Sequence, residues 1–296
     1  MAKIVIDAEL CKHCGRCVQV CPEVLFFQPE KGTVPEVRYG ECLACGHCVV
    51  LCPSEAICHE DFLPGSIHPV HPEMQPSAEQ VLELLRTRRS VREFRNQPVS
   101  KEAIAKILEG ARFAPSAHNS ESTQFVVVQD RATIAQIVQL TVDYLRKLIQ
   151  QLRNPITRRI LRWMAGKELE GAIANLHNLA KVVATYDNGT DTVLYQTPTL
   201  ILFHADRKVG FAGVNANLAV QNAALMVEVL GLGCFYTGFV VAVCDRDNRI
   251  AKLVNLPEDH KIYGGLAVGY PKFNYRNWIE RKPARIQWVE AAEKTS

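Results

Sequence analysis

Two short runs near the N-terminus contain cysteines at spacings that suit metal chemistry. The first run holds Cys11, Cys14, Cys17 and Cys21, and the second holds Cys42, Cys45, Cys48 and Cys52. Each reads C-x2-C-x2-C-x3-C-P, and every cysteine of the first recurs 31 positions later, so the runs form an internal repeat. Three thiolates at this spacing can surround one face of a cuboidal iron–sulfur cluster, and the fourth, before a proline, reaches the neighbouring cluster.

The pattern therefore predicts two ligand sets. The first, for cluster one, is Cys11, Cys14, Cys17 and Cys52, and the second, for cluster two, is Cys42, Cys45, Cys48 and Cys21. Zinc is an alternative, but zinc sites usually take cysteines as separated pairs. A disulfide framework is expected still less, because no secretory signal precedes the runs. Residues 1–60 resemble the two-cluster bacterial ferredoxins, which implies two [4Fe-4S] clusters.

Composition divides the chain of 296 residues, a length typical of about two domains, into an acidic and a basic part. Residues 1–65 hold five Lys or Arg against nine Asp or Glu, and the remainder holds 29 against 22. We expect a ferredoxin domain over 1–63, a Pro-rich linker over 64–77 and a second domain over 78–296. No apolar stretch approaches the roughly 20 residues that span a bilayer, so we expect a cytoplasmic protein without a transmembrane segment or a nucleic-acid partner.

A cationic segment follows the first helix expected after the linker. Ser77 begins this helix, with Gln80 three residues later as in a capping box. The helix ends near Arg88-Arg89-Ser90-Val91-Arg92-Glu93-Phe94. Guanidinium and hydroxyl groups in this arrangement suit a phosphate, because charge-assisted bidentate bonds hold it in one orientation. The alternative is a favourable charge at a helix end.

This segment resembles the R-R-S-x-R-x-F opening of the nitroreductase family of FMN-dependent oxidoreductases. Three later segments resemble the same family in the same order. They are a P-S-x-x-N-S loop at 115–120, a G-L-G-x4-G segment at 231–238 and a closing G-Y-P strand at 264–271. The resemblance covers about residues 78–290.

The resemblance implies an α+β fold, with a central, mostly antiparallel sheet surrounded by helices, and a homodimer with two FMN sites at the subunit interface. The residues that it implies for FMN are Arg88, Arg89, Ser90 and Arg92 at the phosphate and ribityl chain, Pro115, Ser116 and Asn119 at the ring edge, and the main chain of Thr237 and Gly238 near N5. Among later cations, Arg281 and Lys282 match best for the phosphate, with Lys272 and Arg276 as alternatives. No side chain is assigned as a catalytic acid or base.

Together these features predict an FMN-dependent oxidoreductase that passes electrons between two [4Fe-4S] clusters and FMN. The expected acceptor is a small molecule such as a nitroaromatic, a quinone or another conjugated electrophile. Ferredoxin, flavodoxin and NAD(P)H are the candidate donors. Two alternatives stay open, a non-catalytic electron relay to a partner protein and an NAD(P)H-dependent flavin reductase, because fold-level resemblance does not fix a substrate.

A basic stretch over residues 146–167 holds seven Lys or Arg and no acid. Its apolar residues follow helical spacing, and Pro155 is expected to break or kink the helix. We expect the acidic ferredoxin domain, from the same or the partner subunit, to dock on this basic face. The alternatives are a lid, a membrane-surface helix, a surface that attracts an acidic electron carrier or an anionic substrate, and a solvated helix face.

Overall fold

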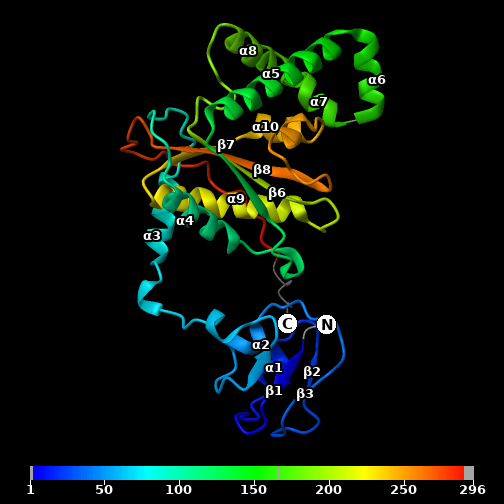
Figure 1. Cartoon of the computed structure of the whole chain (residues 1–296), viewed down its shortest axis with the longest axis vertical. Coiled ribbons are helices and arrows are strands. Elements are labelled where there is room, and N and C mark those ends of the chain that lie inside the picture. The colour runs from blue at the N-terminus through cyan, green and yellow to red at the C-terminus, as the bar shows by residue number, and fades with distance from the viewer. Residues whose placement is uncertain (1–2, 166, 290–296) are drawn as a thin grey trace, which may run out of the picture.

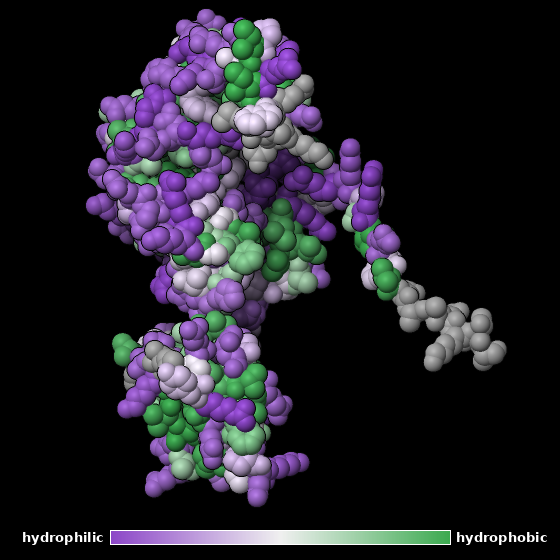
Figure 2. All heavy atoms as spheres, turned by 90° about the vertical axis from the view of Figure 1, so that its right-hand side faces the viewer, coloured by the Kyte–Doolittle hydropathy of each residue, from purple (hydrophilic) through white to green (hydrophobic). Residues whose placement is uncertain are grey.

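A computed structural model describes residues 3–165 and 167–289. The chain folds into an N-terminal unit (residues 3–63) and a larger C-terminal unit (residues 78–289), which lie one above the other in Figure 1. On the face shown in Figure 2, the two units meet at a narrow neck. Among the described residues, none of the helices combines the length and the hydropathy that a membrane crossing requires.

The 31-residue repeat of the sequence is also a structural repeat. In the N-terminal unit, β1 (Ile4–Ile6) pairs antiparallel with β4 (Ile57–His59), and β2 (Phe26–Phe27) with β3 (Glu36–Val37). Two short helices lie inside the cysteine runs, α1 (Arg16–Val20) and α2 (His47–Val50). Each follows a glycine with left-handed backbone, Gly15 (φ 67°) and Gly46 (φ 73°), a conformation that favours glycine.

The connection between the units holds two 3-10 turns, Pro64–Ser66 and Pro72–Met74. It runs along one side of the molecule to α3 (Ala78–Thr87). Ser77 accepts a hydrogen bond from the Gln80 backbone, and the Gln80 side chain accepts one from the Ser77 backbone, so the predicted capping box is present.

A four-stranded antiparallel sheet forms the centre of the C-terminal unit. Its strands are β5 (Gln124–Val128), β6 (Thr199–Asp206), β7 (Gly233–Tyr236) and β8 (His260–Gly269), in the order β5-β6-β8-β7. Alternate side chains of β6 are buried on both faces, Leu202 on one and Phe203 on the other. The predicted α+β class is confirmed.

Residues 124–129 are apolar at their centre, a pattern that predicts a buried central strand, but this prediction is wrong because β5 lies at an edge of the sheet. Most of its apolar residues are nevertheless packed, on one face or the other, although Val127 is 36% exposed. Val128 joins one side of the core, and Phe125 meets the Phe203 ring edge-on at 5.3 Å on the other. An apolar run therefore indicates that both faces of a strand are covered, and it does not report whether both edges are paired.

Helices cover both faces of the sheet (Figure 1). On one face lie α4 (Lys101–Arg112) and α9 (Ala212–Val229), whose small residues, including Ala219 and Ala223, are buried against the strands. The other face carries α5 (Arg131–Arg153), α8 (Leu176–Asp187) and α10 (Gly238–Cys244). Further helices are α6 (Pro155–Ala165), α7 (Lys167–Ala174) and α11 (Arg249–Leu253). The break before Pro155 agrees with the prediction.

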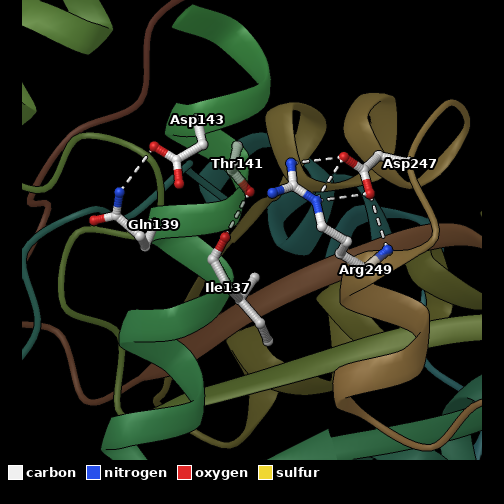
Figure 3. A network of polar contacts seen from close by, with 6 residues as sticks. All are labelled: Ile137, Gln139, Thr141, Asp143, Asp247 and Arg249. Carbon is white, nitrogen blue, oxygen red and sulfur yellow. Dashed lines mark hydrogen bonds and ion pairs between the residues drawn. The ribbon is translucent and has the colours of Figure 1, made fainter. Parts of the chain in front are cut away.

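The middle of α5 lies close to the residues that lead into α11 (Figure 3). Within α5, Thr141 Oγ1 donates to the Ile137 carbonyl at 2.7 Å, and Gln139 donates to Asp143 at 2.9 Å. Asp247 accepts from the Arg249 guanidinium at 2.7 Å. These hydrogen bonds from Arg249 lower the pKa of Asp247, so the pair remains charged at neutral pH.

The basic face does not receive the N-terminal unit of the same chain. The end of α5 and α6 lie at the opposite end of the molecule from that unit (Figure 1). Arg146 is instead paired with Asp143 at 2.8 Å and with Asp187 at 2.7 Å. The side chains of Arg162 and Met164, which belong to this stretch, lie outside the described ones. Same-chain docking on this face was thus a wrong prediction.

Candidate cluster and cofactor sites

Two cavities in the N-terminal unit bring the cysteines together in the predicted sets. One is lined by Cys11, Cys14, Cys17 and Cys52, and the other by Cys21, Cys42, Cys45 and Cys48. Cys48 borders both cavities. The fourth cysteine of each run therefore faces the first three of the other run. This exchange follows from the packing of α1 beside α2.

Backbone N–H groups donate to the cysteine sulfurs at equivalent positions of the repeat. The four bonds, each 3.3–3.4 Å long, are His13 N to Cys11, Ala44 N to Cys42, Leu25 N to Cys21 and Ala56 N to Cys52. Such bonds stabilise the thiolate form, and backbone hydrogen bonds lower the pKa of Cys52 against the opposing effect of burial. Burial, and then the neighbouring thiolates, raise the pKa of Cys48 to about 11. Thiolates gathered in this way suit the positive charge of iron in a cluster.

His59 is a residue of this site that the sequence reasoning missed. Its ring is buried, with 5% of the residue exposed, and its Nε2 lies 3.4 Å from Cys42 Sγ. Because Nδ1 accepts the backbone N–H of Asp61 at 3.2 Å, the proton of the neutral ring lies on Nε2 and points to the sulfur. His59 lies 31 residues after Gln28 and is therefore its equivalent in the repeat. A comparison of the two halves of the repeat would have singled out His59.

A cationic cavity of about 320 Å³ lies where the sequence predicts phosphate binding. Its lining residues are Arg88, Arg89, Ser90, Arg92, Tyr275 and Arg281. None of these four arginines forms an ion pair with a carboxylate in the described part of the chain. Lys282, Lys272 and Arg276 are not among the lining residues. Four guanidinium groups without a carboxylate partner, beside a hydroxyl, match the chemistry of a phosphate group.

The main chain fixes the cationic segment between β7 and the end of β8. The Val91 N–H donates to the Cys234 carbonyl at 2.9 Å, and the Lys272 N–H donates to the Glu93 carbonyl at 2.9 Å. Gly233 lies so close to Val91 that a Cβ atom at this glycine would overlap the valine side chain. The phosphate-binding candidates thus lie on a rigid frame, which is what a fixed ligand orientation requires.

A larger cavity of about 580 Å³ adjoins the cationic one, since Arg92 lines both. Its aromatic lining residues are Tyr144, Tyr195, Phe235, Tyr236 and Phe239, and Gly238 also borders it. The Arg92 guanidinium lies 5.5 Å from the Phe235 ring centre and 5.8 Å from that of Tyr195. An apolar, aromatic cavity with a cation in its lining suits a flat ring system that carries a phosphate.

Two buried hydroxyl groups have no hydrogen-bond partner in the described residues, Thr192 Oγ1 and Thr237 Oγ1. Thr192 lines the aromatic cavity, whereas Thr237, which is 2% exposed, does not line it, and its Oγ1 lies against Gly265 of β8. A buried polar atom without a partner is costly, so such an atom beside a cavity indicates a polar ligand. The residues present therefore fit a flavin nucleotide. No local sequence pattern marks Thr192 or Tyr195, which lie in a loop.

The loop with the predicted ring contacts, Pro115, Ser116 and Asn119, lies elsewhere in the chain. Asn215, near the start of α9, holds it by accepting from Ala117 N at 3.1 Å and by donating to Ser120 Oγ at 3.3 Å. None of the three residues lines the cationic or the aromatic cavity.

The two halves of the predicted site lie at opposite ends of α9. Arg88 lies near Glu228, where its charge acts against the larger effect of burial, which raises the pKa of this carboxyl. At 1.5 Å per residue, Asn215 and Glu228 are about 20 Å apart along the helix. A single chain therefore does not unite Arg88 with Asn119.

Known protein families match both units of the chain. Residues 85–270 match the model of the nitroreductase family, and this is more than half of the chain. The chain belongs to the nitroreductase family. Residues 3–53 match a 4Fe-4S dicluster domain, so this nitroreductase carries a ferredoxin domain. Together these matches make it an FMN-dependent oxidoreductase with an N-terminal 4Fe-4S ferredoxin domain.

Several relatives of this nitroreductase match its C-terminal unit. A protein of Methanothermobacter thermautotrophicus, whose name places it among NADH dehydrogenases or NAD(P)H nitroreductases, is 28% identical over 205 residues, 69% of this chain and 84% of the relative. The FMN reductase [NAD(P)H] of Bacillus subtilis is 27% identical over 65% of this chain and 66% of its own. The structure of a Bacteroides fragilis nitroreductase with bound FMN shares the fold, with a TM-score of 0.53 at 22% identity, over 71% of this chain and 99% of that one.

Proposed function

We propose that this nitroreductase passes electrons between two [4Fe-4S] clusters and FMN, and that FMN delivers them to a small conjugated acceptor such as a nitroaromatic or a quinone. The observation that carries the proposal is that the cationic cavity and the aromatic cavity share Arg92 as a lining residue. It offers a phosphate site and a ring site side by side. The two cysteine-lined cavities of the ferredoxin domain supply the sites for the clusters.

In this proposal each part of the cofactor site has its own task. Arg88, Ser90, Arg92 and Arg281 hold the phosphate by charge-assisted hydrogen bonds. The residues around Thr237 and Gly238 place polar groups beside the ring, and the aromatic lining excludes water and accepts a flat substrate. When bound, FMN supplies the exchange between one-electron and two-electron chemistry.

A second copy of the chain would complete the site. The 115–120 loop and the cationic cavity lie at opposite ends of α9, so a loop from a partner subunit can meet the cavity that its own chain does not reach. A two-fold axis would then create two equal sites, as in other isologous dimers.

A second candidate concerns the electron donor. Relatives named for NAD(P)H raise the alternative of an NAD(P)H-dependent flavin reductase. In the proposed function, electrons instead enter through the ferredoxin domain from a one-electron protein donor.

Mixed subunits provide the test of the shared site. An Arg92→Glu chain loses the phosphate half, and an Asn119→Arg chain obstructs the ring half. Each variant alone should bind little FMN. Co-expressed in equal amounts, they should recover about a quarter of the wild-type FMN sites, because half of the dimers are mixed and each mixed dimer holds one intact site. Arg92→Glu co-expressed with itself under a second tag is the control. Recovery no greater than that of the separate variants would contradict the shared site.

A further inference from the structure

A hydrogen bond joins the second cysteine run of the N-terminal unit to the 115–120 loop of the C-terminal unit. Asn119 Nδ2 donates to the carbonyl oxygen of Ala44 at 2.9 Å. Ala44 lies between Cys42 and Cys45 in the second cysteine run, and Asn119 lies in the loop that resembles the flavin-binding loop of the family. The contact therefore connects a cluster loop with a candidate flavin loop.

The internal repeat shows that this contact is not a general feature of the cluster loops. The residue equivalent to Ala44 in the first run is His13, and its carbonyl accepts from Gln28 Nε2 of the same unit at 3.1 Å. At the position equivalent to Gln28, the second half of the repeat has His59, whose Nε2 faces the sulfur of Cys42. The Ala44 carbonyl is thus left without that internal donor, and Asn119 of the C-terminal unit supplies one.

The two cluster loops also differ in exposure. Lys12, His13 and Cys14 of the first run are exposed, whereas their equivalents in the second run, Leu43, Ala44 and Cys45, are partly buried. Both loops have a left-handed residue at this position, with φ of 54° at His13 and 48° at Ala44. The loops therefore differ in exposure and not in this backbone feature. The second run lies toward the C-terminal unit, and the first run is open to solvent at this loop.

The chemistry of the contact defines which way Asn119 faces. A carbonyl oxygen only accepts hydrogen bonds, so the amide nitrogen of Asn119 must be the atom that faces Ala44. The carbonyl carbon of Ala44 is bonded to the nitrogen of Cys45, so few covalent bonds and one hydrogen bond separate the Cys45 thiolate from the Asn119 amide.

We propose that cluster two is the cluster that exchanges electrons with FMN, across the Ala44–Asn119 contact, and that cluster one is the entry point for an external donor. This inference rests on the proposed function. A reduced one-electron carrier protein is oxidised as it gives an electron to cluster one, which passes it to cluster two. Two such electrons, delivered one at a time, and two protons from solvent convert oxidised FMN to its reduced form.

Two variants with the same chemical change test the contact. Asn119→Asp replaces the donor by a carboxylate that repels the Ala44 carbonyl. Gln28→Glu makes the same replacement at the equivalent His13 carbonyl, inside the ferredoxin domain. Backbone hydrogen exchange over residues 42–46 and 116–121 should accelerate at least tenfold in Asn119→Asp and stay unchanged over 116–121 in Gln28→Glu. This readout does not depend on bound FMN or on activity.

Electron transfer is then measured in the holoprotein with a pre-reduced bacterial-type ferredoxin as the donor. In Asn119→Asp, the rate of flavin reduction per bound FMN should fall at least tenfold, while cluster reduction keeps its wild-type rate. Unchanged exchange over both segments, or an unchanged flavin rate together with faster exchange, would overturn the inference. Wild-type protein that binds clusters but no FMN would instead refute the proposed function, so the two failures are distinguishable.

Discussion

Replacing Cys21 with serine is expected to remove cluster two and to leave cluster one in place. Cys21 belongs by sequence to the first run, but it lines the cavity of Cys42, Cys45 and Cys48. Loss of one thiolate ligand from a set of four should halve the iron content, from about eight to about four per chain. Iron and sulfide analysis of the anaerobically purified protein measures this change.

Two further variants decide whether the ligand sets cross. The electron paramagnetic resonance spectrum of reduced Cys21→Ser should match that of Cys45→Ser, which shares its cavity, and differ from that of Cys14→Ser, which shares its run. Cys58→Ser is the matched control, because Cys58 is an exposed cysteine of the same unit and lines neither cavity. If Cys21→Ser resembled Cys14→Ser, each run would bind its own cluster and the crossed assignment would be wrong.

Replacing Arg92 with alanine is expected to weaken FMN binding by roughly ten- to a hundredfold. The change removes a charge-assisted hydrogen bond worth about 1.5–3 kcal/mol. It also removes the only lining residue that the cationic and aromatic cavities share among those described, so the ring loses support as well as the phosphate. Equilibrium dialysis of FMN against the deflavinated protein measures the affinity.

The control for Arg92→Ala is Arg112→Ala, which removes the same charge from the end of α4. Arg112 pairs with Glu109 at 3.1 Å and lines neither cavity, so its loss should leave FMN affinity unchanged. Arg281→Ala and Lys282→Ala form a second matched pair. The first should weaken FMN and the second should not, because only Arg281 of the two lines the cationic cavity. Equal FMN affinity in Arg92→Ala and wild type would contradict the phosphate assignment.

The sequence identified the parts of this protein that depend on local spacing. The cysteine runs predicted which cysteines line each cavity, because the crossing of the fourth cysteine follows from a repeated motif. The capping box at Ser77 and the helix break at Pro155 are decided by neighbouring residues, so they too were predictable. β5 was misplaced because burial on both faces looks the same in a sequence whether a strand is central or at an edge.

The features that the sequence did not predict depend on contacts between distant segments, which no local pattern encodes. The separation of Arg88 from Asn119 depends on the length and direction of α9, which the loop motifs do not state. The Ala44–Asn119 hydrogen bond joins residues 75 positions apart. The structure is needed to see that Gln28 donates to the His13 carbonyl, whereas His59, at the equivalent position, faces Cys42 and leaves the Ala44 carbonyl to Asn119. The expected docking on the basic face was inferred from net charge and from the short Pro-rich linker, and neither determines which surfaces meet.

Transient reduction of the holoprotein by a pre-reduced ferredoxin tests most directly whether the clusters feed the flavin. Wild type and Cys45→Ser, each with FMN bound in equal amount, are mixed anaerobically with the donor while cluster and flavin absorbance are followed separately. In wild type the clusters should bleach first and the flavin second. In Cys45→Ser the flavin should stay oxidised over the same interval. Flavin reduction at the wild-type rate in Cys45→Ser would contradict the account.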